Sequence, residues 1–172
     1  MNVKHTLNYT KLSLMKKVLF VCLGNICRSP MAEGVFQDLL EKNNLTDQIS
    51  CDSAGTGAYH VGELADSRMQ DTAKKHQLEL TSRARQVTEE DLHEFDYVLA
   101  MDKSNYRNIM RLTNDPKSIK AQVMLMRDFD ELDQGGEVPD PYYGGIDGFE
   151  NVYQILKRSN EKFLAHIQQA EN

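Results

Sequence analysis

The sequence predicts a single α/β domain with a doubly wound, four-stranded parallel sheet and helices on both faces. The chain has 172 residues, which is the usual size of one compact domain. The strand candidates at residues 17–21 and 97–101 are short, continuous apolar runs, a pattern typical of strands buried on both faces of a parallel sheet. Strand candidates alternate with helical patterns four times, as a doubly wound sheet requires. Ligands of such folds bind outside the carboxyl ends of the strands, so we expect chemistry in the loops that follow them.

The first half of the chain supplies two strands and two helices. The run KVLFV at residues 17–21 is the first strand candidate. Ser29 as an N-cap and Pro30 at the first helical position predict a helix that apolar residues at helical spacing continue to about residue 42. The run ISCDSA at residues 49–54 predicts the second strand, and a second helix is predicted over residues 64–76.

The second half supplies the other two strands and a long final helix. Thr88 and Asp91 form a capping pair that predicts a short helix through residue 95. Strands are predicted over 97–101 and 121–126, with a helix over 104–112 between them. Residues 127–147 show no periodicity, and a loop of that length in a compact domain is usually either functional or a misassigned element. Asp147 and Glu150 form a capping pair that predicts the start of a long amphipathic helix.

Composition argues against two classes of partner. The formal net charge is −6 and the isoelectric point is near 5.4, so the chain lacks the basic excess of a nucleic-acid binder. No apolar run approaches the roughly 18 to 20 residues of a membrane span.

Three cysteines form no disulfide framework, which favours a reducing, cytoplasmic compartment. Residues 1–32 nevertheless contain five basic residues and no acidic one, so this segment is locally positive.

The N-terminus has neither a secretory nor a transit pattern. Residues 1–15 lack an apolar core of signal-peptide length, and no arginine precedes Arg28. Met15, followed by two lysines and an apolar strand, also has the features of a true start. We therefore expect residues 1–15 to be a disordered N-terminal extension and the domain to span residues 16–172.

The loop after the first strand carries the strongest chemical signal. It contains a C-x5-R-S motif placed between a strand and a helix, with the residues Cys22, Leu23, Gly24, Asn25, Ile26, Cys27, Arg28 and Ser29. A loop of this length can curl so that its backbone N–H groups and the helix N-terminus surround a tetrahedral anion. Gly24 and Asn25 tolerate the left-handed backbone that such a curl needs. The motif thus predicts a phosphate-binding loop after the first strand.

Three side chains complete a reaction centre. Arg28 has a planar fork that can hold two phosphate oxygens at once. Its positive charge and the helix N-terminus favour the thiolate form of Cys22, which is the nucleophilic form. Asp140, stiffened by the proline that follows it in the long loop, supplies a proton donor for a leaving oxygen. An aryl phosphate suits this site, with its ring held by apolar or aromatic residues such as Tyr59 and Tyr142.

Four segments together resemble a known family. The segments VCLGNICRSPMAEGVF, DSAGTGAYHVG, FDYVLAMDKSN and DPYYGG are similar to those of the low-molecular-weight protein tyrosine phosphatases. The resemblance extends from about residue 16 to the C-terminal helix. It implies that the protein hydrolyses phosphotyrosine in proteins, and small aryl phosphates, through a cysteinyl-phosphate intermediate without a metal ion. Residues 16–172 would then be one phosphatase domain.

The resemblance also implies roles for individual residues. Cys22 would form the phosphocysteine, Arg28 would bind the phosphoryl group, and Asp140 would act first as general acid and then as general base. Cys27 matches the neighbour that can trap Cys22 in a reversible disulfide. Supporting and substrate-binding positions would be those of the remaining loop residues and the pocket wall: Leu23, Gly24, Asn25, Ile26, Ser29, Ser53, Tyr59, Tyr142 and Tyr143.

Plainer interpretations apply to several other residues. Cys51 lies in a strand pattern and fits the core. No metal or other cofactor is expected, since Cys22 and Cys27 are separated by four residues and the histidines show no clustered ligand spacing. His76 and His166 fit helix faces. Asp102, at the end of the third strand, either orients the loop network or caps the next helix, and we favour the cap. The tyrosines of DPYY are wall residues or, alternatively, sites of regulatory phosphorylation.

Competing functions differ in what they require. An arsenate reductase of the same fold needs a relay of further cysteines, and none follows Cys51. A phosphocysteine carrier has no use for Arg28 together with a late general acid. An idle phosphotyrosine-binding module is expected to have lost Cys22, Arg28 or Asp140, and all three are present. Tyrosine-phosphorylated proteins are therefore the expected partners, and binding to nucleic acid or to a membrane is not expected. We expect the protein to be a monomer or a weak dimer.

Overall fold

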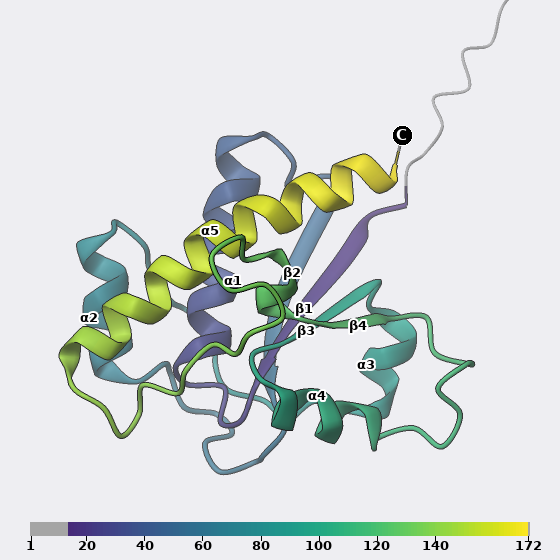
Figure 1. The fold of residues 1–172 in the computed structure, drawn as a ribbon, viewed down its shortest axis with the longest axis horizontal. Helices are drawn as coiled ribbons and strands as arrows, with labels where there is room; N and C mark the ends of the chain where they lie inside the picture. The colour runs from purple at the N-terminus through teal and green to yellow at the C-terminus, as the bar shows by residue number, and fades with distance from the viewer. Residues whose placement is uncertain (1–13, 172) are drawn as a thin grey trace, which may run out of the picture.

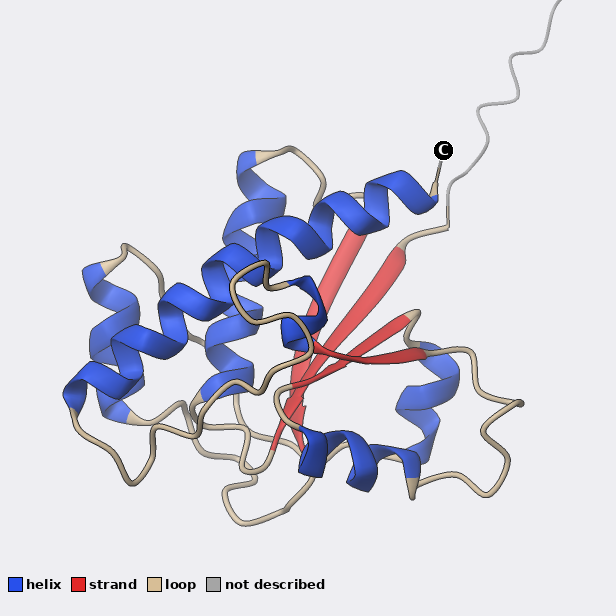
Figure 2. Ribbon diagram, in the orientation of Figure 1, coloured by secondary structure: helices blue, strands red, loops and turns tan. Residues whose placement is uncertain are grey.

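The structure, a computed structural model, describes residues 14–171 and confirms the predicted fold class (Figures 1 and 2). Four parallel strands form one sheet in the order β2-β1-β3-β4. Their bounds are Lys16–Cys22 for β1, Ile49–Gly55 for β2, Tyr97–Ala100 for β3 and Gln122–Leu125 for β4. The order changes direction at β1, so the loop after β1 opens at the topological switch point where ligands of such sheets bind.

Helices cover both faces of the sheet. On one face lie α1 (Arg28–Lys42), α2 (Ser67–Lys75) and α5 (Ile146–Ala170), and α5 crosses over α1 in Figure 1. On the other face lie α3 (Glu89–Glu94) and α4 (Lys103–Met110). Alternate residues of β1 feed the two cores: Val18 and Phe20 pack with the first group of helices, and Leu19 and Val21 pack with the second. Both faces of β1 are buried, which is why its sequence is continuously apolar.

Three predicted helix starts were wrong, and each has a local cause. The first helix begins at Arg28, with Cys27 rather than Ser29 at the N-cap, because the Ser29 hydroxyl is used inside the loop network described below. Pro30 is still tolerated, since the first helical turn needs no N–H donor there. The second helix begins at Ser67, after the N-cap Asp66, and not at residue 64.

The last helix also begins differently from the prediction. Gly145 is its N-cap and Asp147 lies inside its first turn, so Asp147 does not cap it. Glu150 does not complete a capping pair, because its carboxylate contacts His76 Nε2 at 2.9 Å instead. The His76 ring stacks on Tyr153 of the same helix, with 3.6 Å between ring centroids. The predicted helix-face histidine therefore joins α2 to α5. By contrast, the capping pair at α3 is confirmed: Thr88 N donates to Asp91 Oδ2 at 2.8 Å.

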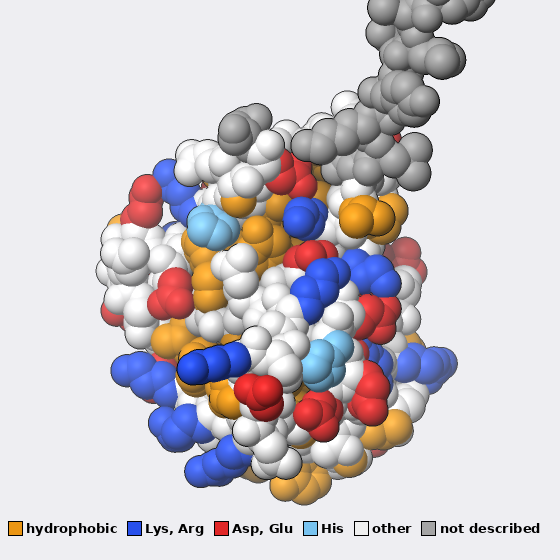
Figure 3. Space-filling view, turned by 90° about the vertical axis from the view of Figure 1, so that its right-hand side faces the viewer, with side chains coloured by type: hydrophobic (Ala, Val, Ile, Leu, Met, Phe, Trp, Pro, Cys, Tyr) orange, Lys and Arg blue, Asp and Glu red, His pale blue; other side chains and the backbone are white. Residues whose placement is uncertain are grey.

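The long predicted loop is shortened at its start by a 3-10 helix, η1 (Met126–Phe129). Residues 1–13 of the expected N-terminal extension lie outside the described residues. Within residues 14–171, no helix is long and apolar enough to cross a membrane. On the face shown in Figure 3, acidic and basic side chains are interspersed, so neither sign of charge covers it.

Candidate active site

A cavity of about 420 Å³ opens at the carboxyl end of β1. It brings together most of the residues that the sequence singled out from the first loop, the second loop and the segment before α5. Its lining consists of Cys22, Leu23, Gly24, Ile26, Cys27, Arg28, Tyr59, His60, Asp140, Tyr142 and Tyr143. The sequence analysis missed His60, although it adjoins the predicted wall residue Tyr59 in the same loop.

The loop from residue 22 to the start of α1 has the geometry of an anion cradle. Asn25 adopts a left-handed conformation with φ of 56°, which asparagine tolerates better than most residues. No side chain caps the N-terminus of α1, so the first N–H groups of this helix are available to bind an anion held in the loop. Gly55, opposite Cys22 in the neighbouring strand, permits the tight curl: a Cβ there would lie 2.7 Å from the Leu23 carbonyl oxygen.

The Cys22 thiol lies at the base of this cradle and is 3% exposed. Its Sγ is 3.0 Å from Ser29 Oγ. Asn25 Nδ2 donates both to Ser29 Oγ at 2.8 Å and to Ser53 Oγ at 3.0 Å. None of Asn25, Ser29 and Ser53 is among the residues that line the cavity. Asn25 and Ser29, predicted as substrate-binding residues, join the predicted supporting residue Ser53 in a network that fixes the side chain facing the sulfur.

Arg28 closes the cradle from below and is also 3% exposed. Its Nη1 donates to Asp102 Oδ2 at 2.7 Å and to the Val138 carbonyl at 3.1 Å, and its Nη2 lies 3.5 Å from Asp140 Oδ2. Burial opposes the charge, but the Cys22 sulfur and the Asp102 carboxylate raise the pKa of the guanidinium above its usual value. Arg28 is therefore a fixed cation in the site.

Asp102 fills both of the roles between which the sequence left a choice. Its Oδ1 accepts the Asn105 N–H at 2.7 Å, which caps α4, while its Oδ2 accepts from Arg28. One carboxylate thus orients the arginine of the cradle and begins the helix after β3.

Asp140 reaches the cavity from the long loop and is the most exposed member of the three predicted catalytic residues, at 40%. Its Oδ1 accepts the Tyr142 N–H at 3.1 Å, so the chain turns tightly around the carboxyl group. Two residues earlier, Val138 N donates to the Met101 carbonyl at 2.8 Å, which joins the loop to the end of β3.

A buried ion cluster holds the beginning of the same loop. The Asp130 carboxylate is fully buried and accepts from Arg127 Nε at 2.8 Å and from Arg158 Nε at 2.7 Å. Arg127 also donates to the Glu137 carbonyl at 3.0 Å. The cluster therefore connects α5 to the backbone just before Val138, which itself contacts Arg28. No sequence signal indicated this anchor, because Arg158 is 28 residues from Asp130 and each member is typical of a solvated loop or helix face.

The wall of the cavity is aromatic and open to solvent. Tyr59 and Tyr143 are strongly exposed, at 76% and 93%, and Tyr142 is 37% exposed. Arg68 of α2 holds Tyr142 in place, with Nη1 donating to its carbonyl at 3.1 Å and the guanidinium 5.3 Å from its ring centroid. The edge of the His60 ring lies close to Gly24, and its Nδ1 contacts Glu63 at 2.7 Å.

The other two thiols lie in different surroundings from that of Cys22. Burial raises the pKa of Cys27 well above its usual range, and Asp66 and Cys22 add to the effect. Burial likewise raises the pKa of Cys51, which packs against the core as predicted. Cys27 lines the same cavity as Cys22, and the reversible disulfide between them stays a prediction. Among the described residues, no group of His, Cys, Asp or Glu side chains is arranged to hold a metal ion.

Comparison with known proteins identifies the family. The family model described as low molecular weight phosphotyrosine protein phosphatase matches residues 17–172. This chain belongs to that family. The low molecular weight phosphotyrosine protein phosphatase of Rattus norvegicus is 47% identical over 149 residues, which cover 87% of this chain and 94% of the relative.

Solved structures give the same result. A protein tyrosine phosphatase from Entamoeba histolytica, crystallised with Hepes in its active site, aligns with a TM-score of 0.85 and 41% identity over 91% of this chain and 99% of its own. A Drosophila arginine phosphatase aligns with a TM-score of 0.81 and 35% identity over 88% of this chain and 97% of its own. The resemblance seen in the four sequence segments is therefore confirmed.

Proposed function

We propose that this low molecular weight phosphotyrosine phosphatase family member hydrolyses phosphotyrosine in proteins, and small aryl phosphates, through a phosphorylated Cys22 and without a metal ion. The observation that carries the proposal is the meeting of Cys22, Arg28 and Asp140 at one cavity. Each of the three has a different role in the reaction: Cys22 is the nucleophile, Arg28 binds the phosphate and Asp140 donates the proton. The phosphatase domain would span residues 16–172.

In the first step the Cys22 thiolate attacks the phosphorus of the bound phosphomonoester. The loop N–H groups and the Arg28 fork hold the phosphoryl oxygens and stabilise the charge that develops on them. The bond from phosphorus to the tyrosyl oxygen breaks, and the leaving oxygen takes the proton of the Asp140 carboxyl group. Tyrosine departs, and the phosphoryl group is covalently attached to the Cys22 sulfur.

In the second step the ionised Asp140 accepts a proton from a water molecule. The water oxygen attacks phosphorus, and the bond from phosphorus to sulfur breaks. Cys22 returns to the thiolate, with Ser29 Oγ 3.0 Å away to donate a hydrogen bond to it, and inorganic phosphate leaves. No oxidant, reductant or metal enters the balance.

The aromatic wall supports an aryl substrate. Tyr59, Tyr142 and Tyr143 stand around the opening, where they can contact the ring of a phosphotyrosine whose phosphate reaches the cradle. Tyrosine-phosphorylated proteins are thus the proposed substrates. The expected cytoplasmic location and the expected monomer or weak dimer stay predictions.

Hydrolysis of an aryl phosphate in the presence of a chelator tests the mechanism. We expect activity to be unchanged by EDTA and to fall by about 10³-fold or more in Cys22→Ser, because the alcohol is a far weaker nucleophile than the thiolate. The matched control is Cys51→Ser, which makes the same change away from the cavity and should keep activity. Loss of activity with EDTA, or survival of activity in Cys22→Ser, would contradict the proposal.

The role of Asp140 is tested by the leaving group. Asp140→Ala should lower turnover by about 10²-fold or more for an aryl phosphate with a basic leaving group and much less for one with an acidic leaving group, which needs no proton. Asp147→Ala, an exposed carboxylate at the start of α5, serves as the control. Equal losses for both leaving groups would remove Asp140 from the role of general acid.

The substrate class is tested with three phosphorylated peptides of one sequence. Phosphotyrosine, phosphoserine and phosphoarginine are compared, the last because one structural relative is named an arginine phosphatase. The open aromatic wall should favour phosphotyrosine in kcat/KM. Preference for phosphoarginine would keep the cysteine mechanism and change the substrate.

A further inference from the structure

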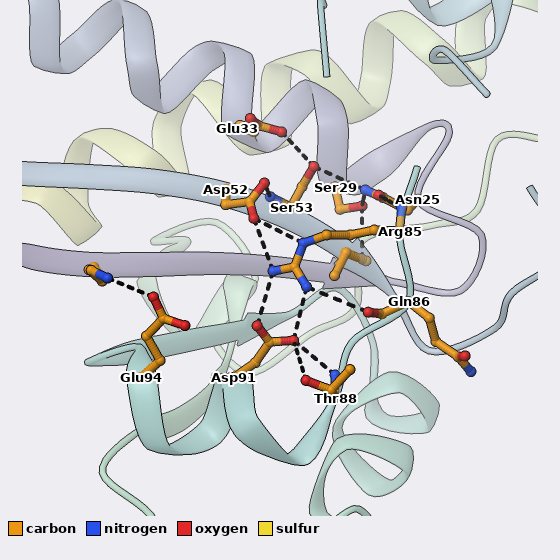
Figure 4. Close-up of polar contacts among 12 residues, drawn as sticks. Asn25, Ser29, Glu33, Asp52, Ser53, Arg85, Gln86, Thr88, Asp91 and Glu94 are labelled. Atoms are coloured by element: carbon orange, nitrogen blue, oxygen red, sulfur yellow. Dashed lines mark hydrogen bonds and ion pairs between the residues drawn. The ribbon is translucent and has the colours of Figure 1, made fainter. Parts of the chain in front are cut away.

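A chain of side-chain hydrogen bonds leads away from the nucleophile and ends on the carboxylate of Glu33, and Figure 4 shows its part from Ser29 to Glu33. It passes from Cys22 to Ser29, then to Asn25 and Ser53, with the separations given above. From Ser53 it continues to Glu33, whose Oε2 is 2.5 Å from Ser53 Oγ. Glu33 lies one helical turn after Ser29 on α1, so one helix holds both the last residue of the chain and the serine that faces the sulfur.

The donors and acceptors of this chain can be assigned. Asn25 uses both of its amide protons, one toward Ser29 and one toward Ser53. Each serine oxygen therefore accepts from Asn25 and must send its own proton elsewhere. Ser53 sends it to Glu33. Ser29 has two acceptors within reach, the Ala54 carbonyl at 3.3 Å and the Cys22 sulfur at 3.0 Å, and the sulfur accepts strongly only when Cys22 is a thiolate.

The orientation of the Asn25 amide is fixed from its other side. Its Oδ1 accepts the backbone N–H of Arg85 at 3.0 Å. The Arg85 side chain is in turn held by Asp52, at 2.9 Å from Nε, and by both carboxylate oxygens of Asp91 (Figure 4). The Asn25 Oδ1 is thus held in place by the Arg85 backbone. The Asn25 Nδ2 can donate its two hydrogen bonds only if the oxygens of Ser29 and Ser53 are free to accept them.

Glu33 is the group that keeps Ser53 in the accepting role. Ser53 is 1% exposed, and a buried hydroxyl whose proton has no acceptor is costly. Without Glu33, the Ser53 hydroxyl would therefore rotate so that its proton points to another group. If the Ser53 proton turned toward Asn25, the donation from Asn25 would be lost, and with it a contact that shapes the cradle. Ser82 and Arg85 also interact with Glu33, while burial raises the pKa of its carboxyl group, as the nearby Asp52 does to a lesser extent.

We propose that Glu33 is a positioning residue for the Cys22 thiolate, acting through Ser53 and Asn25 so that Ser29 donates its proton to the sulfur. The inference rests on the proposed function of Cys22 as a nucleophile. Glu33 itself touches neither the sulfur nor the cavity lining. Its contribution is the direction of the hydrogen bonds between them.

The proposal can be separated from a simple charge effect, because the two have opposite signs. A negative charge near a thiol disfavours the thiolate, so neutralising Glu33 would make Cys22 more reactive if charge alone mattered. If Glu33 acts through the hydrogen-bond chain, neutralising it weakens the donation from Ser29 and makes Cys22 less reactive. The direction of the change therefore decides between them.

The measurement is the rate of alkylation by iodoacetamide as a function of pH, with the modified cysteine located by peptide mapping. In Glu33→Gln we expect alkylation of Cys22 at about pH 6 to slow by about three- to tenfold, as expected when a charge-assisted hydrogen bond becomes a neutral one, and the midpoint of the pH profile to rise. Glu33→Asp keeps the charge but shortens the reach, so it should slow alkylation too. The control is Glu41→Gln, which removes an exposed charge from the same helix.

A double-mutant comparison tests the route. Adding Glu33→Gln to Ser53→Ala should change the alkylation rate by less than about twofold, because the chain is already broken. Faster alkylation in Glu33→Gln, an unchanged rate in both Glu33 variants, or a full further loss in the Ser53→Ala background would each overturn the proposal. Alkylation needs no substrate turnover, so these results stand apart from the hydrolysis test of the proposed function.

Discussion

The two loops that form the site differ in how they are held. The cradle after β1 is short and mostly buried, and hydrogen bonds from β2, α1 and the backbone at Arg85 fix its shape. The segment from Asp130 to Gly145 is long, and its tip is exposed, with Asp140 at 40%. Its contacts with the rest of the fold include the buried carboxylate of Asp130, the backbone of Val138 and the contact of Tyr142 with Arg68.

The difference matches the tasks of the two loops. The cradle must place several N–H groups around one phosphate, and an error of about 1 Å there would weaken all of them. The long loop must bring one carboxyl group to the leaving oxygen and admit a protein substrate, so only its anchors need to be rigid. We therefore expect changes in the cradle to affect chemistry directly. Changes in the long loop, apart from those at Asp140 itself, should affect stability or substrate binding first.

The largest effect is expected at the anchor of the long loop. Asp130→Asn would leave Arg127 and Arg158 beside a neutral group, and breaking a buried ion cluster in this way should lower the free energy of unfolding by about 3 kcal/mol or more. Urea unfolding measures the loss. The alkylation rate of Cys22 should stay within about twofold of wild type, because the cluster reaches the cradle only indirectly, through the backbone beside Val138. A stability change under about 1 kcal/mol would contradict the assigned role.

A pair of glycines tests the rigidity of the two loops directly. Gly55→Ala should lower kcat/KM for an aryl phosphate by about 10²-fold, because its Cβ would press on the backbone of the cradle at Leu23 and Asn25. Gly145→Ala makes the same change at the end of the long loop, where a Cβ would meet open space. That variant should stay within about threefold of wild type. Similar losses in both would show that the two loops do not differ as described.

Asp130 should also make the free energy of unfolding depend on pH in the acidic range. Arg158 and Arg127 and the Leu132 N–H hold the pKa of this carboxyl group below its usual value, against the effect of its burial. A lowered pKa in the folded state contributes stability above the unfolded value of about 3.9, and this is lost as the pH falls below about 4. Unfolding measured between neutral pH and about pH 2 should show a shallower acid limb in Asp130→Asn than in Asp71→Asn, which changes an exposed carboxylate on α2. Identical limbs would contradict the assignment.

The smallest effect is expected at the rim. Tyr142→Ala should raise KM for a phosphotyrosine peptide by about three- to tenfold, since Arg68 holds this ring against the cavity. Tyr143→Ala should change KM by less than about threefold, because that side chain is almost fully exposed. A larger effect at Tyr143 would reverse this order.

The cradle could be predicted from the sequence because its residues are contiguous. A strand pattern, a C-x5-R-S motif and a proline in the next turn lie within fifteen residues, and local chemistry alone constrains what they form. Strands β1 and β3 were predictable for a similar reason: most of their residues are buried, so each is a continuous apolar run. Asp140 was found as a proton donor by its proline and tyrosines, and the family resemblance added its second role as general base.

The parts that were not predicted are polar contacts between distant segments. Glu33 has the appearance of an ordinary acidic residue on a helix surface, and only the position of β2 beside α1 places Ser53 against it. Arg85 and Asp130 are likewise charged residues whose partners are separated from them by many residues or lie on other elements. No local pattern distinguishes such residues from solvated ones, because their burial depends on the completed fold.

The most direct test of the account is to trap the intermediate. Asp140→Ala, which lacks the proposed base for the second step, is mixed with an aryl phosphate that has an acidic leaving group, quenched in acid and analysed by mass spectrometry. The account predicts one phosphoryl group on the peptide that contains Cys22, and none on that peptide in a variant that also carries Cys22→Ser. A phosphoryl group on Cys27 or Ser29, or release of the aryl alcohol with no phosphorylated peptide, would contradict it.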